Sequence, residues 1–348
     1  MKAMILAAGV GSRLDPLTRT IPKPMVPVVN RPVIEHIVEK LAAHNFKTIK
    51  INLHYLGDTI RECLGDGSRL GVEIEYVKED QLWGDAGSVK RSEKFFDDET
   101  FLVVGGDDIS NINLTKFLEF HRQNGAAASQ ALSIVDDPSE YGIVLTEDDG
   151  RITKFQEKPE PGAAFSNTAN TGVYLFEPHV LKTIPSGVQW GFGRNVFPAL
   201  LEEGEPVYGF ITEEYWKDVG NIQVYKNTNF DAMSGKVKLN IHGTLKSEKV
   251  WVGEGSVLAP DVEIEERVVI GRNVTIGPGV KLQSDTIIGD GCHIGEGVVL
   301  QRTIVWNHAT IEAGTRLEGC IVGAHATVGT NFAVFNGLIV DPNRQSPR

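Results

Sequence analysis

Cysteine, positive charge and long apolar runs are all scarce in this sequence. The three cysteines, Cys63, Cys292 and Cys320, lie far apart without the spacing of a metal site, and no group of histidines and cysteines suggests zinc. They are typical of reduced, mostly packed thiols, so we expect a cytoplasmic protein. No stretch is long and apolar enough to span a membrane, and the apolar run after Met1 is too short for a signal peptide.

The balance of charge is acidic, with 46 aspartate and glutamate residues against 34 lysine and arginine residues and a formal net charge of -12. This balance argues against nucleic acid or an anionic membrane as the main partner. It does not argue against a phosphorylated small molecule, because a few local cations and a metal ion can bind one. The length of 348 residues allows two or three folding units.

The first 230 residues have the sequence pattern of an α/β fold. Short apolar runs at 3–8, 48–53, 72–77 and 101–104 predict strands, and the patterns at 33–41 and 114–123 predict helices. Strands separated by helices imply a mostly parallel sheet covered on both faces. Ligands of such sheets bind beyond the carboxyl ends of the strands.

From about residue 250 the pattern changes to a six-residue period. Aliphatic residues fall at every sixth position from Val252 to Leu300, and a second, mostly apolar set precedes them by two positions. After Leu300 the phase slips by one residue and resumes at Val305, Ile311 and Leu317. A period this long predicts a parallel β-helix built of hexapeptides. We therefore expect a catalytic domain at 1–232, a linker at 233–249 and the β-helix at 250–340.

A glycine-containing loop follows the first predicted strand. It reads LAAGVGSRLDPLT at 6–18, with PKPM at 22–25. Small residues let the backbone approach a ligand, and its N–H groups can bind phosphate oxygens. Leu14 stands where a dinucleotide fold needs glycine, and Arg13 follows Ser12 where a Walker loop needs Gly-Lys-Ser/Thr, so both common readings fail.

Three further motifs carry charged residues. The strand FLVVGGDD at 101–108 ends in two aspartates, and YWKDVG at 215–220 contains a third. The segments YGIV at 141–144, FQEKP at 155–159 and NTGVY at 170–174 follow one another in order. EDQLWGDAGS at 79–88 places Trp83 before Gly84 and has an acid at Asp85.

Together these strings resemble the sugar-1-phosphate nucleotidyltransferase family over nearly the whole chain, and are closest to mannose-1-phosphate guanylyltransferases that carry C-terminal hexapeptide repeats. The family's usual loop has glycine where this chain has Ala8, and its usual base segment lacks Trp83 and has threonine at Asp85. The resemblance implies a Rossmann-like domain with a mostly parallel mixed sheet, followed by a β-helix of left hand. It implies transfer of a nucleotide from a nucleoside triphosphate to a sugar 1-phosphate, with release of pyrophosphate.

Residue roles follow from the same resemblance. It implies a nucleotide site made of Leu6, Ala8, Gly9, Gly11, Ser12, Arg13, Lys23, Glu79, Gly84 and Asp107. Arg13 contacts the β- and γ-phosphates, and Lys23 lies near the α-phosphate. Asp107 and Asp218 hold Mg²⁺, and Asp108 is an extra acid that is either a ligand or a turn residue. The sugar phosphate is bound by Gly142, Glu157, Lys158, Asn170 and Gly172. Arg13, Lys23, Asp107 and Asp218 are the residues on which catalysis rests.

Glu79 favours guanine among the bases. A carboxylate only accepts hydrogen bonds, and guanine offers N1–H and N2–H₂ side by side, whereas uracil and thymine present acceptors on either side of N3–H. We therefore expect GDP-mannose to be formed from GTP and mannose 1-phosphate. The alternative is transfer to glucose 1-phosphate from UTP, dTTP or ATP.

Two other functions remain open. The β-helix could carry acyltransferase chemistry, with His293, His308 or His325 as the base, or the chain could be a catalytically silent regulatory subunit. Both are less favoured, because no acceptor site is evident and the four catalytic residues are intact. A β-helix with open ends and flat faces favours self-association, so we expect a homo-oligomer, either a dimer or a tetramer.

Overall fold

The computed structural model describes residues 1–160 and 162–341. The chain forms two compact units. The first contains Met1–Val10, Pro22–Pro24 and Ile37–Asp218, and the second contains Gly11–Ile21, Met25–His36 and Val219–Arg348. The phosphate-loop motif is therefore divided between the two units at Val10.

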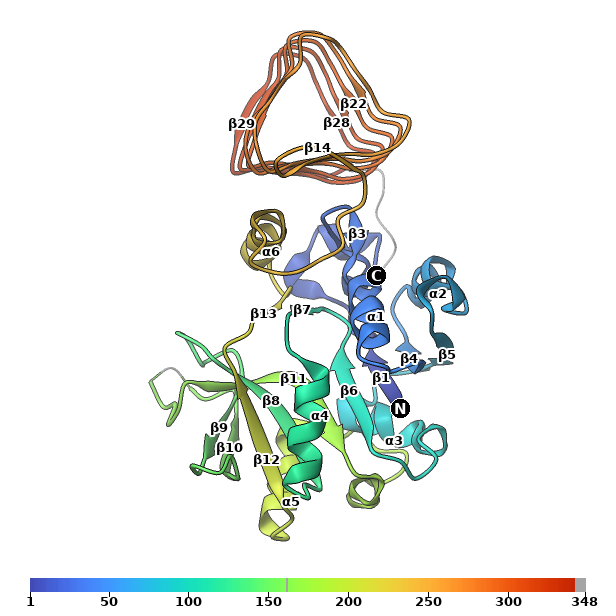
Figure 1. Ribbon diagram of the computed structural model, residues 1–348, viewed down its shortest axis with the longest axis vertical. Coiled ribbons are helices and arrows are strands. Elements are labelled where there is room, and N and C mark those ends of the chain that lie inside the picture. Colours follow the sequence, from blue (N-terminus) through green and yellow to red (C-terminus); the bar gives the residue numbers. More distant parts are fainter. Residues whose placement is uncertain (161, 342–348) are drawn as a thin grey trace. The chain divides into compact units, whose positions relative to one another are not determined.

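A mixed nine-stranded sheet forms the centre of the first unit (Figure 1). Its main path runs through β10 (Ile152–Glu157), β9 (Gly142–Thr146), β11 (Thr168–Phe176), β6 (Phe101–Gly105), β1 (Lys2–Leu6), β4 (Thr48–Leu53) and β5 (Glu73–Lys78). β8 (Ala128–Ile134) pairs with both β11 and β12 (Val207–Thr212). β6, β1, β4 and β5 are parallel, which confirms the four predicted strands, while β11 runs antiparallel to β6, β8 and β9.

Two of the connecting helices lie at the predicted positions 33–41 and 114–123. The helices up to residue 202 are α1 (Val33–Ala43), α2 (Gly57–Leu64), α3 (Gly84–Arg91), α4 (Leu114–Gln123) and α5 (Phe197–Glu202). α4 begins after Asn113, whose side chain accepts a hydrogen bond from the Lys116 amide at 3.0 Å. The core beside the sheet is rich in aromatic rings, and Phe176 stacks on Phe192 with ring centroids 4.8 Å apart. This packing holds the strand ends in place.

Two short β pairs lie outside the main sheet. β7 (Asp108–Ser110) pairs antiparallel with β13 (Trp216–Asp218) in the first unit. β2 (Pro27–Val28) and β3 (Arg31–Pro32) form a hairpin in the second unit. Both pairs follow directly on segments that the sequence marks as functional.

The second unit is dominated by a β-helix, whose stacked coils are seen end-on in Figure 1 as a triangle. Its first face contains β14 (Thr244–Ser247), β15 (Val250–Val252), β18 (Val268–Ile270), β21 (Thr286–Ile288), β24 (Ile304–Val305), β27 (Ile321–Val322) and β30 (Leu338–Ile339). The second contains β16 (Val257–Leu258), β19 (Thr275–Ile276), β22 (His293–Ile294), β25 (Thr310–Ile311) and β28 (Thr327–Val328). The third contains β17 (Glu263–Ile264), β20 (Lys281–Leu282), β23 (Val299–Gln301), β26 (Arg316–Glu318) and β29 (Ala333–Phe335).

Both periodic sets of residues point into the core of the β-helix. Ile288 and Ile294 are fully buried, and so are Val298 and Cys320. Residues two apart in a strand share a face, which explains why both sets are apolar. Val250 pairs with Val268, 18 positions on, whereas Val305 pairs with Val322, 17 positions on. The phase slip in the sequence is therefore a shortened coil.

The predicted linker at 233–249 contains regular structure. α6 (Ile222–Ser234) extends two residues into it and ends at Gly235, which has φ 90°. β14 lies within the same segment and pairs antiparallel with β15, the strand that follows it. Regular structure therefore occupies both ends of this segment.

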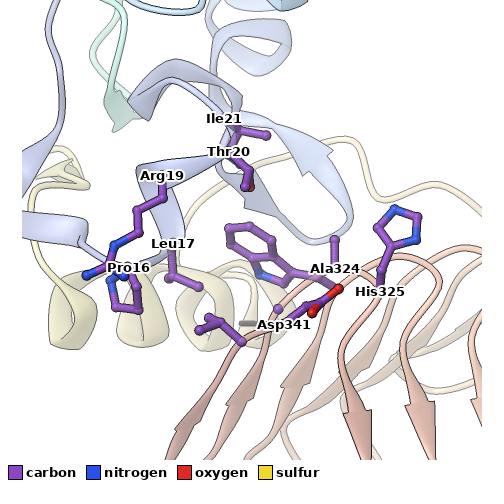
Figure 2. A pocket seen from close by; sticks show the side chains of 11 residues that line it. Pro16, Leu17, Arg19, Thr20, Ile21, Ala324, His325 and Asp341 are labelled. Carbon is purple, nitrogen blue, oxygen red and sulfur yellow. The ribbon is translucent and has the colours of Figure 1, made fainter. Parts of the chain in front are cut away.

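A cavity of about 190 Å³ lies within the second unit (Figure 2). It is lined on one side by residues 16–21 and on the other by late coils of the β-helix. The lining residues are Pro16, Leu17, Arg19, Thr20, Ile21, Trp306, Gly323, Ala324, His325, Val340 and Asp341. Within residues 1–160 and 162–341, no helix has the length and apolarity needed to cross a membrane.

Candidate active site

Lys23 and two of the predicted aspartates meet at one point in the first unit. The Lys23 ammonium donates to Asp107 Oδ2 and, at 2.7 Å, to Asp218 Oδ1. Lys23 is only 9% exposed, so its charge is largely removed from water. Burial lowers the pKa of Lys23, but the charges of Asp107 and Asp218 more than offset this and raise it above the ordinary value.

The carboxylates come together through strand ends. Asp107 lies two residues after the end of β6, and Asp108 pairs with Asp218 across the β7–β13 ladder. A Cβ on Gly106 would lie 2.9 Å from the Leu6 carbonyl oxygen, so only glycine allows β1 and this turn to approach so closely. The predicted pair of aspartates is therefore brought together by the fold.

Asp108 joins this pair as a third acid. Single oxygens of Asp107, Asp108 and Asp218 all lie within 4.8 Å of one another. Burial, together with the charges of the other two aspartates, raises the pKa of Asp108 well above its usual value. Three carboxylates at this spacing fit a hard divalent cation, which takes oxygen ligands and offsets their mutual repulsion.

The first half of the phosphate loop lies at the carboxyl end of β1. The Leu6 carbonyl accepts from the Gly106 amide at 2.9 Å, and the Ala7 amide donates to Asn52 Oδ1 at 2.8 Å. Ala8 is 7% exposed, and a Cβ on Gly9 would meet nothing within 4 Å. An open backbone turn formed by Leu6, Ala8 and Gly9 thus lies at the carboxyl end of the sheet, where Asp107 also lies.

The second half of the loop belongs to the second unit. Gly11 has φ 72°, and its carbonyl accepts from the Leu14 amide at 3.1 Å and from the Thr18 hydroxyl at 2.9 Å. Ser12 and Arg13 are exposed on the short 3-10 helix η1 (Ser12–Leu14). The loop is thus a turn closed by its own hydrogen bonds, with Arg13 on its surface.

Glu79 lies at the carboxyl end of β5 and is only 3% exposed. Asn52 Nδ2 donates to its Oε1 at 3.1 Å, while Oε2 is buried and has no hydrogen-bond partner among the residues that the structure describes. Asn52 therefore joins Glu79 to the Ala7 amide of the phosphate loop. An unpaired buried acceptor costs about 1–3 kcal/mol, which a ligand's N–H donor would recover.

Gly84 and Asp85 begin α3 beside the segment at 190–192. Gly84 has φ 74°, and a Cβ there would lie 2.4 Å from the Trp190 carbonyl oxygen, so the position requires glycine. Asp85 Oδ1 accepts from the Phe192 amide at 2.8 Å and from the Ala86 amide at 2.7 Å, while burial raises its pKa. Asp85, which stands where the family usually has threonine, thus anchors the backbone at Phe192.

On the sugar-phosphate side, Gly142 and Glu157 pair across the β9–β10 ladder. Cβ atoms on Gly142 and Gly193 would lie 2.8 Å and 2.2 Å from Glu157 Oε2, so two glycines make room for this carboxylate. Burial raises the pKa of Glu157. Lys158, which is exposed, has φ 42°, and its amide donates to the Tyr141 carbonyl at 3.1 Å.

Asn170 and Gly172 occupy an irregular step of β11, where the register with β8 shifts between Asn170 and Tyr174. Asn170 Nδ2 donates to the Tyr174 hydroxyl at 2.7 Å, and the Gly172 amide donates to Asn170 Oδ1 at 3.0 Å. A Cβ on Gly172, which has φ 76°, would lie 3.4 Å from Asp108 Oδ2. Gly172 therefore brings the predicted sugar segment beside the aspartate cluster.

Sequence reasoning missed Asn52 and the contact between Asp85 and Phe192. The signal for Asn52 was a polar residue inside the apolar run at 48–53, near the end of a parallel strand where ligands bind. The Asp85 contact joins positions 107 residues apart, so no local pattern could have shown it.

The histidines considered for acyl transfer lie on the outside and corners of the β-helix. His293 is exposed on β22. His308 and His325, both at positive φ, stack with ring centroids 5.0 Å apart. They occupy equivalent corner positions of successive coils, which explains their arrangement without a reaction.

Two family models match the chain. The model described as Nucleotidyl transferase matches residues 2–234, and the model of the EIF2B subunit epsilon LbH domain matches residues 247–345. The second match identifies the triangular coil as a left-handed β-helix, as expected.

Relatives with several names are similar to this chain. A UTP–glucose-1-phosphate uridylyltransferase of Synechocystis is 39% identical over 68% of this chain and 65% of its own length. A mannose-1-phosphate guanylyltransferase of Mycobacterium tuberculosis is 35% identical over 67% of this chain and 65% of its own length. The chain thus spans about two thirds of the length of these curated relatives.

A solved structure has a similar fold. It is a putative glucose-1-phosphate thymidylyltransferase from Bacillus anthracis, with a TM-score of 0.62 and 26% identity. The likeness covers 69% of this chain and 97% of that protein. The first family model covers well over half of the 348 residues. The chain therefore belongs to the nucleotidyl transferase family.

Proposed function

We propose that this protein transfers a nucleotide from a nucleoside triphosphate to a sugar 1-phosphate, forming an NDP-sugar and pyrophosphate. The observation that carries the proposal is the meeting of Lys23 with Asp107 and Asp218 at the sheet edge where the phosphate loop begins. A sugar phosphate oxygen attacks the α-phosphorus in line, and pyrophosphate leaves. The attacking phosphate is already ionised, so no strong general base is needed.

Charge neutralisation and positioning supply the catalysis. Lys23 and Arg13 offset the charge of the triphosphate, and Lys158 binds the sugar phosphate. Glu157 accepts hydrogen bonds from sugar hydroxyls, while Gly142 and Gly172 let the backbone approach the ring. Asp107 and Asp218, with Asp108 beside them, have the oxygen ligands that Mg²⁺ prefers. When bound there, the ion would supply positive charge next to the α-phosphate.

GTP is the triphosphate that Glu79 favours, and mannose 1-phosphate is the matching acceptor. The unpaired Glu79 Oε2 has the chemistry to accept an N–H of guanine, while Asn52 holds the other carboxylate oxygen. The relative from Mycobacterium tuberculosis bears the name of this reaction. The Synechocystis relative, 39% identical, favours a second candidate, the transfer from UTP to glucose 1-phosphate.

A grid of substrates decides between them. Pyrophosphate release is measured with GTP, UTP, dTTP and ATP against mannose 1-phosphate and glucose 1-phosphate, in the presence of Mg²⁺. We expect GTP with mannose 1-phosphate to give the highest kcat/KM. Equal or better use of a pyrimidine triphosphate would contradict the proposal for guanine.

Glu79→Gln is the matched variant for the base. Glutamine keeps an oxygen for Asn52 but replaces the unpaired oxygen with a donor that faces the N–H groups of guanine. We expect kcat/KM for GTP to fall by about tenfold or more, which is the scale of losing a hydrogen bond to a charged group. The rate with UTP should change much less.

A further inference from the structure

The β2–β3 hairpin (residues 27–32) begins four residues after Lys23 in the chain. Its two turn residues, Val29 and Asn30, have φ 45° and 66°. Valine is branched at Cβ and is rarely found at positive φ, so this conformation is strained. Such a turn persists only where its surroundings hold it. Val29 is 1% exposed, so the surroundings of this turn are protein.

Helix α6 supplies two hydrogen bonds to the hairpin. The Tyr225 hydroxyl donates to the Pro27 carbonyl at 2.9 Å, and the Val29 amide donates to Asn229 Oδ1 at 2.9 Å. Tyr225 and Asn229 are both fully buried. Asn229 Nδ2 also donates to the Tyr225 carbonyl at 2.9 Å, so the two side chains are fixed on one turn of the helix. Both bonds reach the strand and turn that follow the Lys23 segment.

The β-helix supplies the next contacts, all within the second unit. Trp306 Nε1 donates to the Tyr225 hydroxyl at 2.8 Å, so this hydroxyl accepts from the β-helix and donates to the hairpin. Asn30 Nδ2 donates to the Ile288 carbonyl at 2.8 Å. The hairpin is thus hydrogen-bonded directly to α6 and to β21, and it is linked through the Tyr225 hydroxyl to Trp306 next to β24.

The cavity of Figure 2 lies next to the hydrogen bond between Trp306 and Tyr225. Trp306 is one of the residues that line it and is 6% exposed. A ring that borders a cavity is not fixed by packing on that side. Its hydrogen bond to Tyr225 therefore helps to fix its orientation.

We propose that Trp306, Tyr225 and Asn229 are positioning residues that hold the β2–β3 hairpin and, through the chain between Lys23 and Pro27, set the position of Lys23 for nucleotide transfer. The β-helix then contributes to the reaction rate, in addition to any part in assembly. The effect on rate rests on the proposed function, whereas the holding of the hairpin does not.

The test uses Tyr225→Phe and Trp306→Phe in the full-length protein. Each substitution keeps a ring in place and removes one partner of the Trp306–Tyr225 hydrogen bond. Hydrogen exchange of peptides covering residues 22–33 is measured together with kcat and KM. Tyr225→Phe removes the hydrogen bonds of this hydroxyl to both Pro27 and Trp306. We expect about tenfold faster exchange in this segment and a fall in kcat of about tenfold, the scale of losing buried hydrogen bonds, with KM changed less than twofold.

A double variant and a matched control sharpen the test. Tyr225→Phe with Trp306→Phe should be no slower than Tyr225→Phe alone, because both changes remove the same hydrogen bond. Tyr76→Phe is the control, since its hydroxyl also donates to a backbone carbonyl, that of Gly65, at 2.7 Å. It should leave kcat and the exchange of residues 22–33 unchanged. If Tyr225→Phe does not fold, Trp306→Phe decides, because it leaves the hydrogen bond from Tyr225 to Pro27 in place.

Wild-type exchange in residues 22–33 and wild-type kcat in Tyr225→Phe would overturn the proposal. A fall in melting temperature without a change in kcat would do so as well, because it would show a purely structural role. If the wild-type protein transfers no nucleotide over the whole substrate grid, the proposed function fails, and hydrogen exchange alone then decides whether the hairpin is held in this way.

Discussion

Buried polar groups are hydrogen-bonded in the β-helix, whereas those around the aspartate cluster are crowded or unpaired. Thr286, Thr303 and Thr315 are fully buried in the β-helix, and each hydroxyl donates to a backbone carbonyl at 2.7–2.8 Å. In the first unit, three carboxylates share one small region, and Glu79 Oε2 is buried without a partner among the described residues. Satisfied groups stabilise the coil, whereas crowded or unpaired ones lower stability and are expected where a ligand completes them.

The largest effect should come from removing charge at the aspartate cluster. Lys23→Ala and Asp107→Ala are each expected to lower kcat by about 10² or more, the scale of losing a charge that stabilises the transition state. Steady-state pyrophosphate release measures this. Lys281→Ala serves as the control, because Lys281 forms an exposed pair with Glu263 at 3.0 Å on the β-helix and should leave kcat unchanged. Near-normal rates in the first two variants would refute their assignment.

A smaller effect, on stability alone, is expected in the β-helix core. Ile294→Val removes one methyl group from a fully buried side chain and should lower the free energy of unfolding by about 1 kcal/mol. Urea denaturation measures the loss, and kcat at 25 °C should stay within twofold of wild type. A large fall in kcat in a variant that is still fully folded would show that the β-helix core affects catalysis as well as stability.

The smallest effect should follow pH at Asp108. Its pKa is raised by burial and by its two acidic neighbours, so between the ordinary value of 3.8 and the raised value the folded protein holds a proton that the unfolded chain has lost. Stability therefore falls as pH rises through this window. In metal-free buffer at pH 7, Asp108→Asn should melt about 2 °C higher than wild type, corresponding to under about 1 kcal/mol.

Melting temperatures at pH 3, 5 and 7 test this sign. The advantage of the asparagine variant should disappear at pH 3, where Asp108 is protonated in both states. An advantage of equal size at pH 3 and pH 7 would mean that the carboxylate's charge is not the cause.

Much of the fold could be predicted because its signals are local. The period of six requires only that each short strand bury residues of one face, so the β-helix followed from spacing, and its phase slip marked the 17-residue coils. The apolar strand at 101–104, followed by Gly-Gly-Asp, placed Asp107 at the carboxyl end of the sheet in the same way. β14 gave no such signal, because it is stabilised by pairing with β15 and carries no periodic pattern of its own.

The sequence by itself determined the α/β pattern and the six-residue period of the chain, the loop at 6–18, and the types of charged residue available to the site. Only the tertiary structure decided that Asp108 faces Asp218, that Asn52 joins Ala7 to Glu79, and that Trp306 reaches the hairpin behind Lys23 through Tyr225. The physical reason is separation along the chain. A periodic pattern depends on near neighbours, whereas these contacts depend on strand register and helix packing between residues 27 to about 200 positions apart.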